Sequence, residues 1–194
     1  MGEEIYIERA RNGDKEAFIQ LFECYKQKVF RTAFIILKDR QLAEDVVQDA
    51  FLQVYLKLGE LNDLGAFKIW LYRITVNHCY SLSKKLKKIL TVEISGLDFL
   101  NTGAGEDFDI PDNIVLRKEF RQTVFQIINS LPAKYKTVLT LYYYIDSSLK
   151  DISQIVKCSE AAVKSRLFYS RKIMKKTLTS QGIKLNFHDG EGLY

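Results

Sequence analysis

Apolar side chains recur along most of the chain at the three- and four-residue spacing of amphipathic α-helices. The first run lies in residues 14–37 and consists of Phe18, Leu21, Phe22, Tyr25, Val29, Phe30, Ala33 and Leu37. Asp14 precedes it and is of a residue type that caps helix N-termini. A second run follows Asp39 and reaches Leu58, and a break at residues 59–65 separates it from a third helix over residues 66–88. Three helices are therefore predicted in the first 88 residues.

The same spacing predicts four more helices in the second half of the chain. They cover residues 114–129, 133–144, 149–156 and 160–178. Pro132 suits the opening of the helix that follows it. The segment Thr137–Tyr144 is rich in β-branched and aromatic residues, so a strand is an alternative there. No segment sustains the alternation of a β-strand for long, and the predicted fold class is all-α.

Charge divides the chain into blocks that its net charge of +5 conceals. Residues 1–88 contain 15 basic and 12 acidic side chains, whereas residues 114–178 contain 13 basic and 4 acidic ones. Between them, residues 89–113 contain six acids and no Lys or Arg, together with glycines and a proline. This composition predicts an acidic linker between two small helical domains, residues 1–88 and 114–178, with a tail over residues 179–194.

Composition also excludes several classes of protein. No apolar run reaches the ~18–20 residues of a membrane span, and the acidic N-terminus does not resemble a secretion signal, so a cytoplasmic protein is expected, not an integral membrane protein. Cys24, Cys79 and Cys158 are widely spaced, which favours free thiols over disulfides or a zinc site. The sequence has no Gly-rich phosphate loop, H-E-x-x-H or recognisable nucleophile motif, so no catalysis, cofactor or metal is predicted.

The two last predicted helices have the spacing of a helix-turn-helix. Residues 149–156 precede a three-residue turn, and Ser159 can cap the helix that begins at Glu160. Apolar side chains on both helices would pack them together: Ile152, Ile155, Val156, Val163 and Leu167. The second helix carries six basic residues and a single acid, which suits insertion into a DNA major groove. A solvated basic helix is the alternative.

The second predicted helix has an acidic face. Asp45 and Asp49 lie four residues apart, and such a like-charge pair costs a helix about 0.2–0.5 kcal/mol. An external basic partner would compensate for this cost, with Gln48 and Leu52 in the same stripe. A solvated acidic face explains the pattern equally well.

The third predicted helix alternates aromatic with basic side chains, a composition that suits single-stranded or melted nucleic acid. The basic side chains could follow a phosphate backbone, and aromatic faces could hold unstacked bases. Trp70, Leu71 and Ile74, however, fit core positions better than stacking platforms.

Three segments together closely resemble bacterial sigma factors of the extracytoplasmic-function group of the sigma-70 family. They are residues 43–51 (AEDVVQDAF), residues 66–80 (AFKIWLYRITVNHCY) and residues 162–167 (AVKSRL). They occur in the order and at the spacing of the family, and the resemblance extends over residues 14–178. It implies a factor without chemistry of its own that directs core RNA polymerase to promoters.

The resemblance also implies which residues contact which partner. Those facing the basic coiled coil of the largest core subunit are Asp45, Val46, Gln48, Asp49 and Leu52, whereas Phe51 mainly packs the domain. Those facing the melted −10 element are Leu61, Asn62, Asp63, Lys68, Trp70, Arg73, Asn77, Tyr80 and Lys84, with the loop 61–65 capturing a flipped base. Those facing the −35 element are Glu160, Ala161, Lys164, Ser165, Arg166, Phe168 and Arg171.

Family members usually have an anti-sigma partner, and their acidic linker lies in the active-site cleft and RNA exit channel of the core.

The sequence departs from the family pattern at two places in the helix-turn-helix that would bind the −35 element. Lys157 stands where the family usually has Gly, and Tyr169-Ser170 replaces the customary Arg-Ala. A left-handed backbone at Lys157 would be strained.

Three alternatives to this function stay open. One is a helix-turn-helix regulator that binds duplex DNA without core polymerase. Another is the divergent toxin-gene sigma group of clostridia, with the same biochemical function. The third is a nucleic-acid enzyme that uses Asp45 and Asp49 with a metal, although no third ligand is in view.

Overall fold

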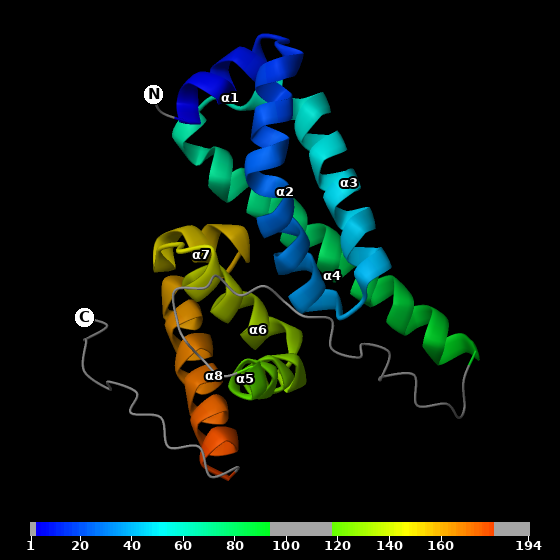
Figure 1. The fold of residues 1–194 in the computed structure, drawn as a ribbon, viewed down its shortest axis with the longest axis vertical. Helices are drawn as coiled ribbons and strands as arrows, with labels where there is room; N and C mark the ends of the chain where they lie inside the picture. Colours follow the sequence, from blue (N-terminus) through cyan, green and yellow to red (C-terminus); the bar gives the residue numbers. More distant parts are fainter. Residues whose placement is uncertain (1–2, 94–117, 181–194) are drawn as a thin grey trace. The chain divides into compact units, whose positions relative to one another are not determined.

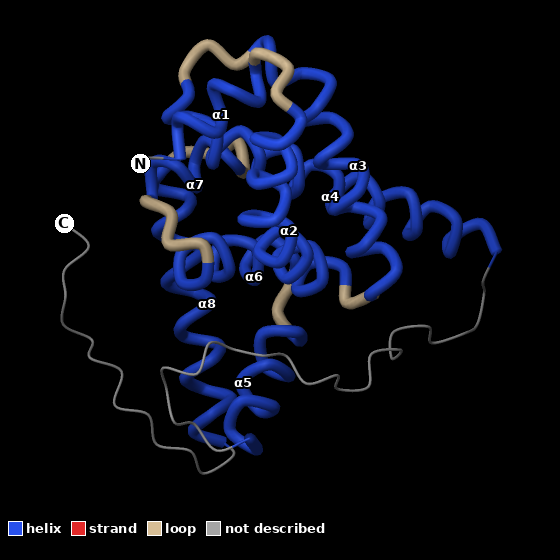
Figure 2. The backbone as a smooth tube through the Cα atoms, turned by 45° about the horizontal axis from the view of Figure 1, so that its top comes forward, coloured by secondary structure: helices blue, strands red, loops and turns tan. Residues whose placement is uncertain are grey.

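The computed structural model describes residues 3–93 and 118–180, and all regular elements in these ranges are helical (Figures 1 and 2). The chain divides into two compact units, each described here by itself. The first unit consists of α1 (Glu3–Arg11), α2 (Lys15–Leu37), α3 (Arg40–Lys57), the 3₁₀ turns η1 (Leu58–Glu60) and η2 (Leu64–Ala66), and α4 (Phe67–Glu93). With the second unit we describe α5 (Lys118–Ser130), α6 (Ala133–Leu139), the π-helical η3 (Thr140–Tyr144), α7 (Leu149–Ile155) and α8 (Glu160–Ser180). The all-α prediction is confirmed.

Helix α2 begins where the sequence indicated. The Asp14 carboxylate accepts hydrogen bonds from the backbone N–H groups of Glu16 (3.0 Å) and Ala17 (3.1 Å), and Arg9 pairs with it at 2.7 Å. The hydrogen bond from Ala17 and then that from Arg9 lower the pKa of Asp14, because both favour the charged carboxylate. This cap fixes the first turn of a 23-residue helix against which α1, α3 and α4 pack.

The core of the first unit lies where α2, α3 and α4 meet. Its wholly buried side chains include Val29, Ala33, Ala43, Val46, Ala50, Val54, Leu71 and Val76. Aromatic rings join α2 to α3, with the Phe51 ring centroid 4.8 Å from that of Phe22 and 6.5 Å from that of Phe18. Phe51 is only 4% exposed, so it packs the domain, as expected from the resemblance.

Helix α1 was not predicted, because a single residue of this helix, Ile7, is buried and the apolar pattern is correspondingly weak. Its N-terminal end is held by the Tyr25 hydroxyl, which donates a hydrogen bond to the Glu3 carboxylate. Burial, and next this contact with Glu3, raise the pKa of Tyr25 well above its ordinary value. Arg11, near the other end of α1, donates to the Leu61 carbonyl oxygen at 3.3 Å. Helix α1 therefore supports the loop before α4.

The structure corrects the predicted start of the linker. Helix α4 continues to Glu93, five residues past the predicted boundary at Lys88, because no glycine or proline interrupts the chain before Gly96. The rest of the predicted linker, residues 94–113, lies outside the described residues, as do residues 114–117 and the tail from residue 181. Thr179 and Ser180, assigned to the tail, belong to α8.

The second unit contains a helical segment of unusual form. The segment Thr137–Tyr144, for which a strand was the alternative, continues α6 and ends as a π-helix. The Ile145 N–H donates to the Thr140 carbonyl oxygen five residues earlier, at 3.1 Å. Helix α6 packs against α8, and the two also share a polar contact, in which the Ser170 hydroxyl lies 3.5 Å from the Tyr135 carbonyl oxygen.

The helix-turn-helix has the predicted capping and burial. Ser159 accepts a hydrogen bond from the Ala162 N–H at 3.2 Å, so it caps α8. Four of the five predicted packing residues are almost wholly buried: Ile152, Ile155, Val163 and Leu167. Lys157, in the turn, has a left-handed backbone with φ = 51°. The strain expected at this position is therefore present.

Candidate functional site

The outer face of α3 carries the predicted polymerase-contacting residues. Asp45, Gln48, Asp49 and Leu52 are all exposed, and Leu52 is 58% exposed. Since positions three and four apart share one face of a helix, these side chains form a single stripe. The structure corrects one assignment: Val46 is wholly buried, because it lies on the opposite face that packs against the core of the unit. It supports the stripe from behind and cannot touch a partner.

The loop before α4 has the predicted exposure. Asn62 and Asp63 are exposed, and Leu61 is half-buried. The Asp63 carboxylate accepts a hydrogen bond from the Gly65 N–H at 3.0 Å and so fixes the turn into η2. A side-chain Cβ at Gly65 would come within 3.3 Å of that carboxylate oxygen. The loop is thus held at Leu61 by Arg11 and at Gly65 by Asp63, with Asn62 projecting between them.

Helix α4 places its candidate nucleic-acid residues at different depths. Asn77 and Lys84 are exposed, and four others are half-buried: Lys68, Trp70, Arg73 and Tyr80. Leu71 and Ile74 are core residues, as predicted, at 0% and 5% exposed. Trp70 is less buried than expected, since it is only half-buried.

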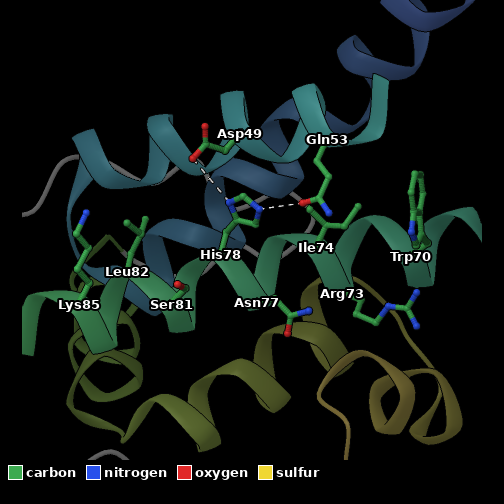
Figure 3. Close-up of a pocket in the computed structure, with 10 residues that line it drawn as sticks. All are labelled: Asp49, Gln53, Trp70, Arg73, Ile74, Asn77, His78, Ser81, Leu82 and Lys85. Carbon is green, nitrogen blue, oxygen red and sulfur yellow. Dashed lines mark hydrogen bonds and ion pairs between the residues drawn. The ribbon is translucent and has the colours of Figure 1, made fainter. Parts of the chain in front are cut away.

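An open groove of about 520 Å³ lies between α3 and α4 (Figure 3). It brings together a residue of the α3 stripe, Asp49, with three of the candidate α4 residues, Trp70, Arg73 and Asn77. The remaining lining residues are Gln53, Ile74, His78, Ser81, Leu82 and Lys85. The sequence alone did not indicate that the predicted protein-binding and nucleic-acid-binding residues border one groove.

His78 bridges the two sides of this groove, and the sequence analysis did not assign it a role. Its Nε2 lies 3.0 Å from the Gln53 side-chain oxygen, and its Nδ1 lies 3.7 Å from a carboxylate oxygen of Asp49 (Figure 3). Because Gln53 Oε1 can only accept, His78 Nε2 donates the hydrogen bond in this arrangement. The signal that could have found it is its spacing, since His78 lies four residues after the core residue Ile74 and therefore on the same face of α4.

Helix α8 presents most of its candidate −35 residues to solvent. Glu160, Ala161, Ser165 and Phe168 are exposed, whereas Lys164, Arg166 and Arg171 are half-buried. Phe168 is 60% exposed, which is unusual for a phenylalanine without a partner surface. Tyr169, the departure noted in the sequence, lies edge-on to Phe168 with ring centroids 5.6 Å apart.

Two other findings concern metals and membranes. Within residues 3–93 and 118–180, no three His, Cys, Asp or Glu side chains gather as they would around a metal ion. None of the helices in the described part of the chain is long and apolar enough to span a membrane.

Two family models match the chain, one in each unit. Sigma-70 region 2 matches residues 21–89, and Sigma-70 region 4 matches residues 121–174. The first match covers α3, the loop and most of α4, and the second covers the helix-turn-helix. These are the two segments that carry the candidate residues.

Similar sequences extend over most of the chain. The RNA polymerase sigma-H factor of Pseudomonas aeruginosa is 34% identical over 176 residues, which cover 89% of this chain and 91% of the relative. The ECF RNA polymerase sigma factor SigW of Bacillus subtilis is 31% identical over 176 residues, covering 89% of this chain and 94% of the relative.

Solved structures share the fold. The sigma factor RpoE of Bartonella quintana, in complex with the anti-sigma factor NepR, is 21% identical with a TM-score of 0.66, and the match covers 84% of this chain and 96% of that one. CnrH in complex with the cytosolic domain of CnrY has a TM-score of 0.64 at 19% identity, with 92% and 97% covered. Together with the sequence matches, the fold shows that the chain belongs to the extracytoplasmic-function group of RNA polymerase sigma factors.

Proposed function

We propose that the stripe Asp45, Gln48, Asp49 and Leu52 on α3 is the surface that binds core RNA polymerase, through the basic coiled coil of its largest subunit. This proposal rests on one observation: the carboxylates of Asp45 and Asp49, four residues apart, are exposed beside the exposed Leu52. Two like charges at this spacing weaken the helix unless a cationic partner lies against them. Leu52 adds apolar surface that water would otherwise cover.

The loop 61–65 and α4 bind the melted −10 element in this proposal. The exposed residues Asn62 and Asp63 would contact the flipped base. The basic residues Lys68, Arg73 and Lys84 would follow the phosphate backbone of the displaced strand. Trp70, Asn77 and Tyr80 offer ring faces and hydrogen-bond donors to unpaired bases. The hydrogen bond from Arg11 to Leu61 supports a loop that is already shaped before DNA binds.

Helix α8 binds the −35 duplex in the major groove. Lys164, Ser165 and Phe168 face the bases, with Glu160 and Ala161 at the start of the helix. Arg166 and Arg171 lie nearer the backbone. Each Lys or Arg that neutralises a phosphate should contribute about 0.9 to the logarithmic salt slope of binding.

The first domain in this proposal extends to the end of α4 at Glu93, the second covers residues 114–180, and the acidic residues 94–113 between them occupy the active-site cleft and RNA exit channel of the core. The factor has no chemistry of its own and acts in the cytoplasm. An anti-sigma partner, which can hold it at the membrane, controls it. The anti-sigma factor NepR, bound to the structural relative RpoE, supports this control.

Reconstitution with core polymerase tests the proposal. We expect the full chain plus core to initiate at cognate promoters, and the double variant Asp45→Lys/Asp49→Lys to bind core weakly while the −35 contact of the C-terminal unit is unchanged. A matched control reverses two exposed acids of α2, Glu16 and Glu23, and should bind core normally. If the α3 variant bound core polymerase as tightly as the wild type, the stripe would not be the core-binding surface. Tight operator binding by the free protein, with no initiation, would favour the helix-turn-helix regulator.

A further inference from the structure

Three consecutive tyrosines lie at the end of α6, in the π-helical segment η3. Thr140 and Leu141 are buried, whereas the Tyr143 side chain is 60% exposed. π-Helical turns are rare and frequently accompany functional sites. An exposed phenol at the end of such a turn is therefore a candidate to bind a partner.

Tyr143 is joined to α8 by Arg171. The guanidinium Nε donates a hydrogen bond to the Tyr143 hydroxyl oxygen at 2.7 Å. The guanidinium carbon also lies 5.5 Å from the centroid of the Tyr143 ring and 5.7 Å from that of Tyr142. The two tyrosine rings lie edge-on, with centroids 5.0 Å apart. Arg171 is therefore oriented by two rings and a hydroxyl group.

This arrangement places two hydrogen-bond donor groups next to each other. A tyrosine hydroxyl that accepts a hydrogen bond still has its own hydrogen to donate. The guanidinium, with Nε engaged, still has the four N–H groups of its terminal nitrogens. The strongest ligand for such a pair is an oxyanion that can accept from both groups at once.

The position of Arg171 on α8 indicates which oxyanion the pair binds. Arg171 lies three residues after Phe168 and seven after Lys164, so all three share one face of the helix. Lys175 extends this face by one more turn and adds another positive charge. Phosphates of the DNA backbone accept hydrogen bonds from arginine and tyrosine side chains, and the cationic face is complementary to them.

We propose that Tyr143 and Arg171 together bind one backbone phosphate of the −35 duplex, with Tyr143 an additional DNA-binding residue contributed by α6 and η3. This inference rests on the proposed binding of α8 to the −35 element. Tyr143 contributes a neutral donor, and Arg171 contributes the charge. The pair sets the position of α8 along the groove and does not read the bases.

The test uses holoenzyme assembled from the full chain and core polymerase, with promoter duplexes that carry cognate or altered −35 sequences. Tyr143→Phe keeps the ring but removes the hydroxyl, so we expect promoter affinity to fall about two- to tenfold, the value of one hydrogen bond. The fall should be equal on all −35 sequences, with an unchanged salt slope because no charge is lost. Arg171→Met should lower the salt slope by about 0.9.

Tyr135→Phe is the matched control, since it removes a phenol hydroxyl from α6 outside the Arg171 cluster, and its affinity should equal that of the wild type. A Tyr143→Phe holoenzyme with wild-type promoter affinity overturns the inference while the −35 function of α8 stands. A loss of core affinity in place of DNA affinity also overturns it and assigns Tyr143 to a protein contact. If the wild-type holoenzyme does not distinguish −35 sequences, the proposed function of α8 fails as well.

Discussion

Lys157 occupies a turn position at which a glycine should be more stable. It follows the end of α7 with φ = 51°, and the next N–H, that of Cys158, donates to the Ser153 carbonyl oxygen at 3.1 Å. This six-to-one hydrogen bond around a left-handed residue is the Schellman motif, whose left-handed position is usually glycine. We predict that Lys157→Gly stabilises the protein without moving α8.

The expected magnitude follows from two opposing terms. A residue with a Cβ loses about 1–2 kcal/mol in the left-handed region, and glycine does not. Glycine in turn gives the unfolded chain more conformational freedom, which costs about 0.4–1 kcal/mol. The net gain should therefore be about 0.5–1 kcal/mol. A gain of 1 kcal/mol raises the melting temperature of a 60–100-residue domain by about 4–8 °C.

Urea unfolding followed by circular dichroism measures the gain, and amide hydrogen exchange in residues 149–167 localises it. Two controls separate backbone strain from side-chain effects. Lys157→Ala keeps the Cβ and should change stability little, and Lys172→Gly, inside α8, should destabilise by about 1 kcal/mol. If Lys157→Gly destabilised the protein as Lys172→Gly does, or if Lys157→Ala stabilised it equally, the strain argument would be wrong.

Three further predictions concern single contacts. Ser159→Ala removes the cap of α8 and should cost about 1 kcal/mol in urea unfolding, whereas Ser159→Asp should restore most of it. The pKa of Tyr25 is raised in the folded protein from its ordinary value of 10.0. Above pH 10.0 the phenol therefore ionises in the unfolded chain but not in the folded one, so stability falls as pH rises. Tyr25→Phe should flatten the fall in stability with pH. If the variant lost stability at high pH as the wild type does, burial of Tyr25 would not be its cause. Asp49→Lys should weaken core binding but stabilise the fold, measured by pull-down and thermal melting.

The helices that carry the candidate site could be predicted because each has one strongly apolar face. The first unit buries Leu21, Tyr25, Val29 and Ala33 of the α2 pattern and Ala43, Val46, Ala50 and Val54 of the α3 pattern. The caps Asp14 and Ser159 act as their positions indicate. Helix α1 was missed because it buries only Ile7. The end of α4 was misplaced because a charge boundary is not a helix boundary: no glycine or proline lies between Lys88 and Gly96, and α4 continues to Glu93.

Pairs formed across helices could not be predicted from spacing within one helix. His78 reaches Gln53 and Asp49 only because α4 packs on α3, and Tyr143 reaches Arg171 only because α6 packs on α8. Val46 shows the opposite error. It follows the exposed Asp45 in sequence, but a 100° rotation per residue turns it into the core.

Stability and function should change in opposite directions on the α3 stripe, and this separates a binding surface from a solvated face. Asp49→Lys removes a repulsion with Asp45 and replaces it with an acidic-to-basic pair four residues apart, each effect worth about 0.2–0.5 kcal/mol. The variant also loses the 3.7 Å contact between Asp49 and His78, which offsets part of this gain. Because the buried support, Val46, is unchanged, the helix should still become more stable, by less than about 1 kcal/mol. A solvated acidic face would gain the same stability and lose nothing else. Only a surface that meets a basic partner would lose binding at the same time.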